Sequence, residues 1–595
     1  MRLIKGIIYD VSVASHMTIN HKHMKYIFSM FLFGSLCLLI SCGPSVKPAD
    51  KVILGGTIYT VDDSQPIVEA VVINGDKIEF AGSETEARKY IGENTEVIDL
   101  EGKTMTPGFI EGHGHFMGVG YNELNLDLMY ITSYDELVAK VKEAVDRAQP
   151  GQWILGRGWH QDKWDVKPDK MIKGFQTHHL LSEVSPNNPV FLRHASGHAA
   201  LANAKAMEVA GVNQLSVEAL KESSEEGGEI IRDEMGNPTG IFNERAMGII
   251  SKHIPQDDDS RDSQALSLAI QACWRNGITS FHDAGASREN IELFNQFKND
   301  GKLGVRLYVM LTGWDRDLVY EWFKKGPVVD PDNLLTIRSV KLNCDGALGS
   351  RGAWLLEPYT DRPDFYGMAT FPMDSVLTTS RAALKSGFQV CAHAIGDRAN
   401  QEILNRYEQA FTENPGVKDH RFRIEHAQHL HPNDIPRFGK LGVIPAMQAI
   451  HMSSDRPWAI ERLGEKRIVE GAYMWQSLLK SGAVIVNGTD APVEPLNPIP
   501  SFYASVTRKT LKGEPAGGYE PNEKMTRAQA LRSYTLDAAY GAFEEKIKGS
   551  IEKGKLADLV VFTENINIME AGEMDILKAE VAMTFVGGKV VYKKQ

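Results

Sequence analysis

Two histidines separated by one glycine, His113 and His115, have types and a spacing that could do chemistry. On a β-strand the side-chain period is two, so both imidazoles are expected on one face, with α-carbons about 6.6 Å apart. That separation suits a single metal ion. Gly112 and Gly114 are expected to leave room for an ion and its water to approach the backbone.

A histidine pair makes a metal site only if further ligands converge on it, so the elements that position them matter. The central part of the chain alternates apolar runs typical of strands with helical stretches such as 134–149, 263–275 and 373–386. This alternation predicts a (β/α)8 barrel of the TIM type, with a doubly wound open sheet as the alternative. The eight expected strands are 108–113, 278–283, 305–311, 337–342, 389–393, 423–426, 443–447 and 483–488.

The spacing of these strands is uneven. At about 31 residues for each strand-helix unit, the first and fourth strands lie too far apart along the chain. We therefore expect a large insertion early in the barrel, at about residues 125–260.

In such a barrel, chemistry gathers at the carboxyl ends of the strands. The polar residues at those ends are His113, His115, Lys341, His393, His426 and Asp490. Imidazole and carboxylate groups bind zinc or a similar divalent ion. An ammonium group would repel a cation, but an amine that has captured carbon dioxide becomes a carbamate, which can bridge two ions. Any one histidine could be a core or surface residue, whereas six such residues at strand ends favour a shared site.

The same residues carry a family resemblance. The chain resembles the amidohydrolase superfamily over roughly residues 51–590, and within it the family 3 branch, which includes proteins similar to N-substituted formamide deformylase. The matching motifs are His113-Gly-His115, Lys341 to Arg351, His393 to Asp397, Glu425 to Gln428 and Gly488 to Pro492.

The resemblance implies a ligand set. His113, His115 and Asp490 would hold one divalent ion, His393 and His426 a second, and carboxylated Lys341 would bridge the two. Zinc is the expected metal, and a site with a single ion is the alternative.

The resemblance also implies a reaction, cleavage of an amide-type C–N bond in a small molecule. Bound divalent ions lower the pKa of water from 15.7 to near 7, which would provide a metal-activated hydroxide, and they polarise the carbonyl group under attack. Asp490 is expected to act as the base that takes the proton of that water. The alternatives are deamination or ring opening of a cyclic amide within the same superfamily, and an inactive envelope binding protein.

Three further residues are candidates for binding the substrate. Trp159 could wall an apolar pocket, and His198 could hydrogen-bond the substrate carbonyl; the competing interpretations are a core tryptophan and a helix cap. His451, just after the seventh strand, could orient the tetrahedral intermediate. His429 and His431 are expected to be exposed loop residues.

The first fifty residues have the composition of a targeting segment and tether. Lys25 precedes an apolar run that is short for a membrane span and ends in Ser41-Cys42, which resembles a bacterial lipobox. We therefore expect an exported protein of the bacterial cell envelope, with lipidated Cys42 anchoring it to a membrane. Met24, and not Met1, could be the true start.

Composition limits the remaining function classes. The chain has 595 residues, 43% of them hydrophobic, and a net charge of -12, which argues against a nucleic-acid partner. Cys273, Cys344 and Cys391 follow no paired spacing and are expected to be buried thiols. Nothing in the sequence specifies the oligomeric state, and a homo-oligomer is compatible with it.

Both ends of the chain show short alternating patterns typical of strands. Residues 51–106 include a hairpin signal at Asn74-Gly75-Asp76, and residues 546–595 repeat the pattern. We expect the two ends to form one small β-sandwich domain beside a barrel spanning residues 107–545.

Overall fold

The computed structural model describes residues 46–195, 197–212, 228–255, 259–563 and 566–595. The expected secretion signal and Cys42 lie outside the described residues. The chain forms two compact units, Met1–Pro48 and Ala49–Gln595, and every described helix and strand belongs to the second. Among the described residues, no helix has the length and apolar character needed to cross a membrane.

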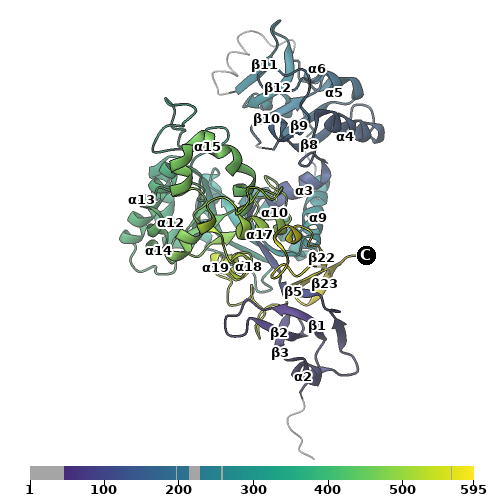
Figure 1. The fold of residues 1–595 in the computed structure, drawn as a ribbon, viewed down its shortest axis with the longest axis vertical. Coiled ribbons are helices and arrows are strands. Elements are labelled where there is room, and N and C mark those ends of the chain that lie inside the picture. The colour runs from purple at the N-terminus through teal and green to yellow at the C-terminus, as the bar shows by residue number, and fades with distance from the viewer. Residues whose placement is uncertain (1–45, 196, 213–227, 256–258, 564–565) are drawn as a thin grey trace, which may run out of the picture. The chain divides into compact units, whose positions relative to one another are not determined.

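Eight parallel strands form the central sheet of this unit, and they are the eight that the sequence predicts (Figure 1). They pair in the order β20-β19-β18-β17-β16-β14-β13-β6, and a short strand, β15 (Val328–Val329), adds antiparallel to β16. Their bounds are β6 Phe109–Gly114, β13 Ile278–Ala286, β14 Arg306–Thr312, β16 Leu335–Asn343, β17 Gln389–Ala394, β18 Arg423–His426, β19 Ile444–Met447 and β20 Val486–Asn487. The predicted (β/α)8 barrel is confirmed.

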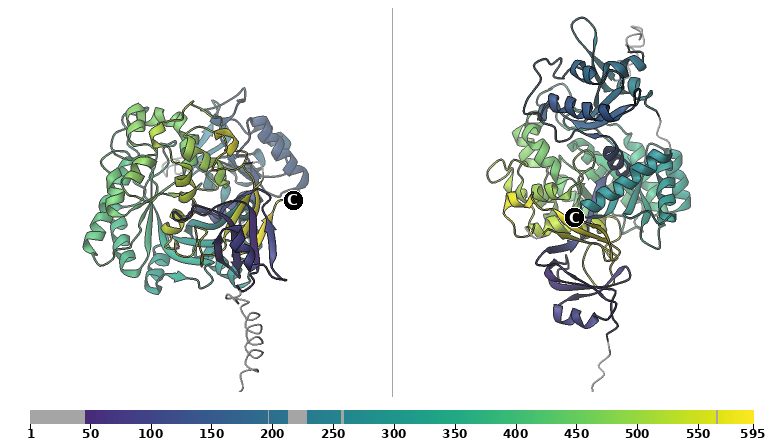
Figure 2. Two further views of the ribbon diagram at one scale, coloured as in Figure 1. Left: turned by 60° about the horizontal axis from the view of Figure 1, so that its bottom comes forward. Right: turned by 90° about the vertical axis from the view of Figure 1, so that its right-hand side faces the viewer.

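Helices cover the outside of this sheet (Figure 2). Because both faces of a strand are then buried, the strands appear in the sequence as nearly continuous apolar runs; every residue of β18 and β19 is buried. The covering helices are α9 Asp259–Arg275, α10 Arg288–Asn299, α11 Arg316–Lys325, α12 Met373–Ser386, α13 Asp397–Glu413, α14 Ile435–Leu441, α15 Ala449–Gly471, α16 Trp475–Lys480, α17 Pro498–Thr507, α18 Arg527–Ser533 and α19 Leu536–Gly541.

The first and last barrel strands, β6 and β20, meet at a seam where the sheet closes. Gly112 allows this approach, because a Cβ atom there would lie 2.3 Å from the carbonyl oxygen of Asn487. The carboxyl group of Glu111 bridges the seam by accepting hydrogen bonds from the amide of Thr489 at 2.7 Å and from its hydroxyl at 2.9 Å. Close backbone contact therefore replaces a regular strand ladder at the closure.

A separate sheet occupies the interval where the strand spacing predicts an insertion. Its order is β11-β12-β10-β9-β8-β7, and it begins after α3 (Phe116–Leu124). Its strands are β7 Leu126–Asp127, β8 Ile154–Trp159, β9 Val190–His194, β10 Ala199–Ala202, β11 Gly228–Arg232 and β12 Pro238–Glu244. The helices packed with it are α4 Tyr134–Arg147, η2 Gln161–Lys163, α5 His179–Val184, α6 Ala204–Val209 and α8 Met247–Ser251.

The two ends of the chain join in one eight-stranded sheet, in which β21 pairs antiparallel with β5. The predicted hairpin is present, since Asn74 pairs with Lys77. One face of the sheet encloses apolar side chains from both ends, including Ile53 and Phe585. The elements are β1 Lys51–Tyr59, β2 Ile67–Asn74, β3 Lys77–Gly82, α2 Glu84–Ala87, η1 Arg88–Tyr90, β4 Glu96–Asp99, β5 Thr104–Pro107, β21 Leu559–Phe562, β22 Val581–Val586 and β23 Lys589–Lys593. Two short helices pack against barrel helices, η4 Pro521–Glu523 against α16 and α20 Glu573–Ile576 against α17.

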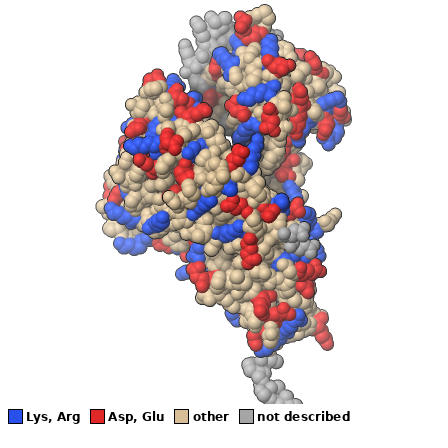
Figure 3. Space-filling model, viewed as in Figure 1, with Lys and Arg blue, Asp and Glu red and all other residues tan. Residues whose placement is uncertain are grey.

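The surface and the thiols match the sequence analysis. On the face seen in Figure 3, acidic and basic side chains are interspersed. Cys273, Cys344 and Cys391 are buried free thiols, and burial raises the pKa of each. The expectation of buried thiols is confirmed for these three.

Candidate metal centre

The two histidines that open the barrel both reach the same carboxylate. His113 lies in β6 and His115 follows it directly. Oδ1 of Asp490 is 3.5 Å from Nε2 of His113 and 3.3 Å from Nε2 of His115. The His113 side chain is buried, whereas 45% of the His115 side chain is exposed. The centre is therefore open to solvent on the His115 side.

The seam explains why Asp490 stands beside these histidines. Its amide donates to the carbonyl oxygen of His113 at 2.8 Å, and the amide of His115 donates to that of Ala491 at 2.7 Å. Asp490 has a φ of 59°, a left-handed conformation that non-glycine residues rarely adopt without compensating contacts. These backbone bonds hold the turn after β20 against the end of β6.

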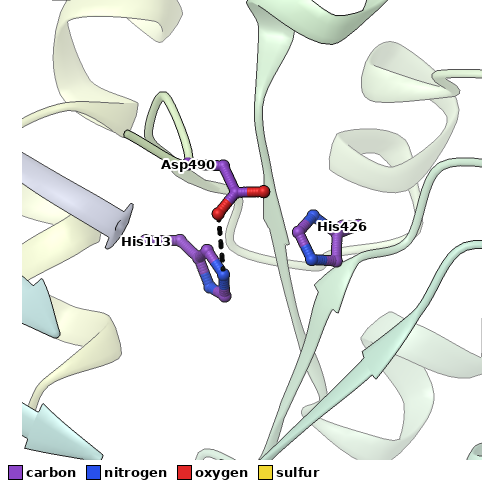
Figure 4. A group of neighbouring side chains, drawn as sticks. All are labelled: His113, His426 and Asp490. Atoms are coloured by element: carbon purple, nitrogen blue, oxygen red, sulfur yellow. Dashed lines mark ion pairs between the residues drawn. The ribbon is translucent and has the colours of Figure 1, made fainter. Parts of the chain in front are cut away.

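His393 and His426 lie at the ends of two neighbouring strands, β17 and β18. The ring centroid of His426 lies 4.9 Å from that of His113 and 4.5 Å from that of His393. One donor atom each of His113, His426 and Asp490 lies within 4.8 Å of the other two, and Figure 4 shows these three side chains together. Residues far apart in the chain thus converge at one end of the barrel.

Lys341 lies inside this group. Its Nζ is 3.1 Å from Nε2 of His113, and its side chain is buried in the barrel. Burial lowers the pKa of Lys341, although the charges of Glu425 and Asp490 oppose that effect. A larger fraction of the amine is therefore neutral than in water.

Buried polar groups fix the orientation of the imidazoles. Nδ1 of His113 contacts the Glu425 carboxylate, which also accepts hydrogen bonds from Arg423 at 2.7 and 2.8 Å. Nδ1 of His426 lies 2.7 Å from Oε1 of Gln448. Because each Nδ1 is engaged in this way, Nε2 is left to face the centre, as for histidines that bind metals.

The charge state of the centre follows from its surroundings. Burial and the Lys341 charge lower the pKa of His113 to about 4, and burial together with neighbouring positive groups lowers that of His426 well below its usual value. Burial alone would raise the pKa of Asp490, but the contact with His115 and the charges of the nearby histidines lower it well below its usual range. At neutral pH His113 and His426 are therefore neutral imidazoles beside the carboxylate of Asp490.

These residues fit a divalent ion. Within the described part of the chain, neither Oδ1 of Asp490 nor Nε2 of His393 has a hydrogen-bond partner, although both atoms are buried. Buried polar atoms without partners are rare, and neutral imidazole with carboxylate is a ligand set of zinc. An ion would satisfy both atoms.

Asp345 is a residue of the centre that the sequence analysis assigned no role. Its Oδ1 lies 3.3 Å from Nε2 of His393, and its carboxylate accepts hydrogen bonds from the amides of Trp354, Ile395 and Gly396. It lies within the Lys341 to Arg351 motif, four positions after the lysine. An acidic residue just beyond a strand end was the available signal.

The three proposed substrate residues differ in their surroundings. Trp159 is fully buried in the insertion, where its Nε1 donates to the carbonyl oxygen of Leu192 at 2.8 Å; it is a core residue and walls no pocket at the centre. His198 contacts Glu244 on the same sheet at 3.0 Å. His451 does lie beside the centre, with its ring 6.1 Å from that of His426 and its Nδ1 2.9 Å from Gln428.

Two other expectations are wrong. His429 was expected to be exposed but is buried, 3% accessible. Gly112 and Gly114 were expected to make room for an ion, but the space beside them is filled: a Cβ atom would lie 2.3 Å from the carbonyl oxygen of Asn487 at Gly112 and 2.6 Å from the Phe281 ring at Gly114. The glycines allow strand packing.

Known proteins share the sequence pattern that builds this centre. A family model for the amidohydrolase family matches residues 96–592. The chain belongs to the amidohydrolase family. The resemblance drawn from the sequence motifs is confirmed.

Individual amidohydrolase relatives match over most of their length. The chain is 34% identical to Protein LONG AFTER FAR-RED 3 of Arabidopsis thaliana, covering 92% of each chain. It is 27% identical to N-substituted formamide deformylase of Arthrobacter pascens, covering 92% of this chain and 98% of that one. The crystal structure of an uncharacterized metal-dependent hydrolase from Pyrococcus horikoshii OT3 matches with a TM-score of 0.70 at 27% identity, over 88% of this chain and 99% of that one. Together with the family, this neighbour supports a metal-dependent hydrolase.

Proposed function

We propose that the protein hydrolyses an amide-type C–N bond in a small molecule. One observation carries the proposal: donor atoms of His113, His426 and Asp490 lie within 4.8 Å of one another at the end of a barrel. The similarity to N-substituted formamide deformylase, an enzyme named for an amide substrate, adds support.

We assign the six residues as follows. His113, His115 and Asp490 would hold one zinc ion, and His393 and His426 would hold a second. Lys341 in its carboxylated form would be a ligand of both; its lowered pKa favours the neutral amine that reacts with carbon dioxide. Ions bound there would lower the pKa of water and polarise a carbonyl group.

The chain's own residues then move the protons. Asp490, a carboxylate at neutral pH, accepts a proton from water while the oxygen of that water attacks the carbonyl carbon. The C–N bond breaks with its electron pair on nitrogen, and Asp490 returns the proton to that nitrogen. The products are a carboxylic acid and an amine. His451 contacts Gln428 through Nδ1, and Nε2 has no partner among the described residues, so it is available to bind the carbonyl oxygen.

The test combines metal analysis with turnover. The zinc-loaded full-length protein should contain one or two ions per chain and hydrolyse formamides, N-acyl amino acids or simple amides. Chelation should abolish turnover, and zinc should restore it. Asp490→Asn should lose at least about 100-fold in kcat, in the range of general base catalysis. If the metal-loaded protein instead only releases ammonia from an amino-heterocycle, the proposal is replaced by deamination. If it only opens the ring of a lactam, the proposal is replaced by cyclic-amide hydrolysis. A protein that binds no metal would refute the proposal.

We also propose export and anchoring to a bacterial envelope membrane through lipidated Cys42. Support comes from the apolar run ending in Ser41-Cys42. Cys42→Ser should move the protein from the membrane fraction to the soluble fraction, whereas Cys37→Ser should not. Equal membrane association of both variants would refute lipidation at Cys42.

A further inference from the structure

Two arginines on the insertion sheet lie side by side without an acidic partner. Arg157 of β8 and Arg193 of β9 are paired positions on neighbouring parallel strands. Such residues have α-carbons about 4.8 Å apart and side chains on the same face. Neither arginine forms an ion pair with any described residue, and each charge acts unfavourably on the other. Like charges placed in this way destabilise a sheet.

Arg157 lies within electrostatic reach of the metal centre. The charge of Asp490 acts favourably on Arg157, although the two residues belong to different sheets. One terminal nitrogen of Arg157 donates to the carbonyl oxygen of Ala195 at 3.1 Å. Its Nε is buried and, in the described structure, has no hydrogen-bond partner. Part of this guanidinium is therefore held in place while another part lacks an acceptor.

A bound anion would offset both the repulsion between the two arginines and the lack of a hydrogen-bond acceptor at Nε of Arg157. A carboxylate placed by the two guanidinium groups would screen their repulsion and accept charge-assisted hydrogen bonds, for which the planar fork of arginine is well matched. The basic groups of the centre are already engaged, since Arg423 pairs with Glu425 and Lys341 is assigned to the metal ions. A negatively charged substrate needs positive groups outside the ligand shell.

We propose that Arg157 and Arg193 bind a carboxylate on the substrate, so that the enzyme hydrolyses the amide bond of N-acyl amino acids. This inference rests on the proposed C–N hydrolysis at the same centre. Water adds to the acyl carbon, the C–N bond breaks, and nitrogen takes a proton. The products are the free carboxylic acid and an amino acid whose own carboxylate stays on the arginine pair until release.

Matched substrates test the inference. N-acetylphenylalanine and N-acetylphenethylamine differ only in the carboxylate, and their N-formyl analogues form a second pair; both enantiomers are tested. Wild type should prefer the carboxylate member of a pair by at least about 30-fold in kcat/KM, in line with a charged hydrogen-bonded contact. Arg157→Met and Arg193→Met should each lose about 10-fold or more of that preference, mainly through KM. Arg157→Lys should recover part of it.

The control variant is Arg232→Met. Arg232 ends β11, which runs antiparallel to β12, so it lies at the opposite edge of the same sheet, and its substitution removes the same charge. This variant should behave as wild type. Arg193 is exposed, so Arg193→Met remains informative if Arg157→Met does not fold. An equal loss on carboxylate and neutral substrates would show that Arg157 acts only through Asp490, and it would overturn the inference.

A binding measurement separates the two proposals. Calorimetry compares 3-phenylpropanoate with 3-phenylpropanamide, using wild type and both methionine variants. Tighter binding of the carboxylate to wild type, lost in the variants, supports the arginine pair even if no amide is hydrolysed, in which case the reaction proposal fails alone. Equal binding of both compounds overturns the arginine pair even if neutral amides are hydrolysed.

Discussion

The amide of Asp490 donates a 2.8 Å hydrogen bond to the carbonyl oxygen of His113, so the step that closes the barrel also assembles the centre. The same seam holds Glu111 against Thr489 and allows the close approach of Gly112 to Asn487. Closure and ligand placement are therefore one event, and damage to the seam should reach the metal site.

Gly112→Ala tests that coupling. The added Cβ would lie 2.3 Å from the Asn487 carbonyl oxygen, so the strands must separate. We expect a loss of about 3 kcal/mol in the free energy of unfolding together with lower zinc content. Gly248→Ala is the matched control, because its Cβ would meet nothing within 4 Å. Urea titration and elemental analysis measure both effects, and a stable, fully zinc-loaded Gly112→Ala protein would contradict the coupling.

Gln448→Leu should weaken zinc binding while leaving every proposed ligand in place. His426 would lose the partner that contacts its Nδ1 at 2.7 Å, and such second contacts are worth about 10- to 100-fold in metal affinity. Competition with a chelator of known affinity measures the change. Gln409→Leu, at an exposed residue that donates to Glu413, should leave the affinity unaltered. Equal affinities for the two variants would show that Gln448 does not position His426.

Lys341→Met should reduce the zinc content from two ions to about one. Without a bridging carboxylate, the buried imidazoles of His393 and His426 would hold the second ion weakly. Stoichiometry by elemental analysis is the measurement, and wild type prepared without bicarbonate should show the same deficit until bicarbonate is restored. Two ions in both preparations would argue against carboxylation of Lys341.

The buried side chain of His429 should make the stability of the folded protein sensitive to acid. Burial lowers its pKa to about 3 from 6.5, so the folded protein keeps this imidazole neutral. A lowered pKa means that the unfolded chain binds the proton first. The contribution to stability is therefore complete above pH 6.5 and is lost as the pH falls toward 3.

His429→Phe removes this pH-dependent contribution to the free energy of unfolding. Between pH 7 and pH 5 the free energy of unfolding should fall by about 2 kcal/mol less in the variant than in wild type. Urea titrations at the two pH values give the comparison, and His253→Phe, at an exposed histidine, serves as control. A pH dependence identical to wild type in both variants would place the acid sensitivity elsewhere.

The barrel strands could be predicted because each one has a local signature. A strand buried on both faces appears as an apolar run, and in β6, β17 and β18 a histidine is the last or next-to-last residue of the strand. The parallel order then brings those ends to one edge. Fold class and the convergence of the six residues follow from these features alone.

Other features depend on contacts that no local pattern records. The sequence around Trp159 is compatible with a residue that lines a pocket, and only the packing of the insertion sheet shows that Trp159 is a core residue. The crowding at Gly112 comes from Asn487, and the burial of His429 comes from packing such as that of Tyr473, whose ring lies 5.4 Å away. Asp345 acts through backbone amides of another strand end. Each is a tertiary effect.

The residues paired across the seam are separated by up to 378 positions, and β5, which leads into β6, pairs with β21 near the end of the chain. A growing polypeptide presents His113 and His115 long before Asp490 and the supporting last strands exist. If the proposed ions bind, they can do so only after synthesis is complete, and the compartment in which the finished chain folds would then determine which metal it receives.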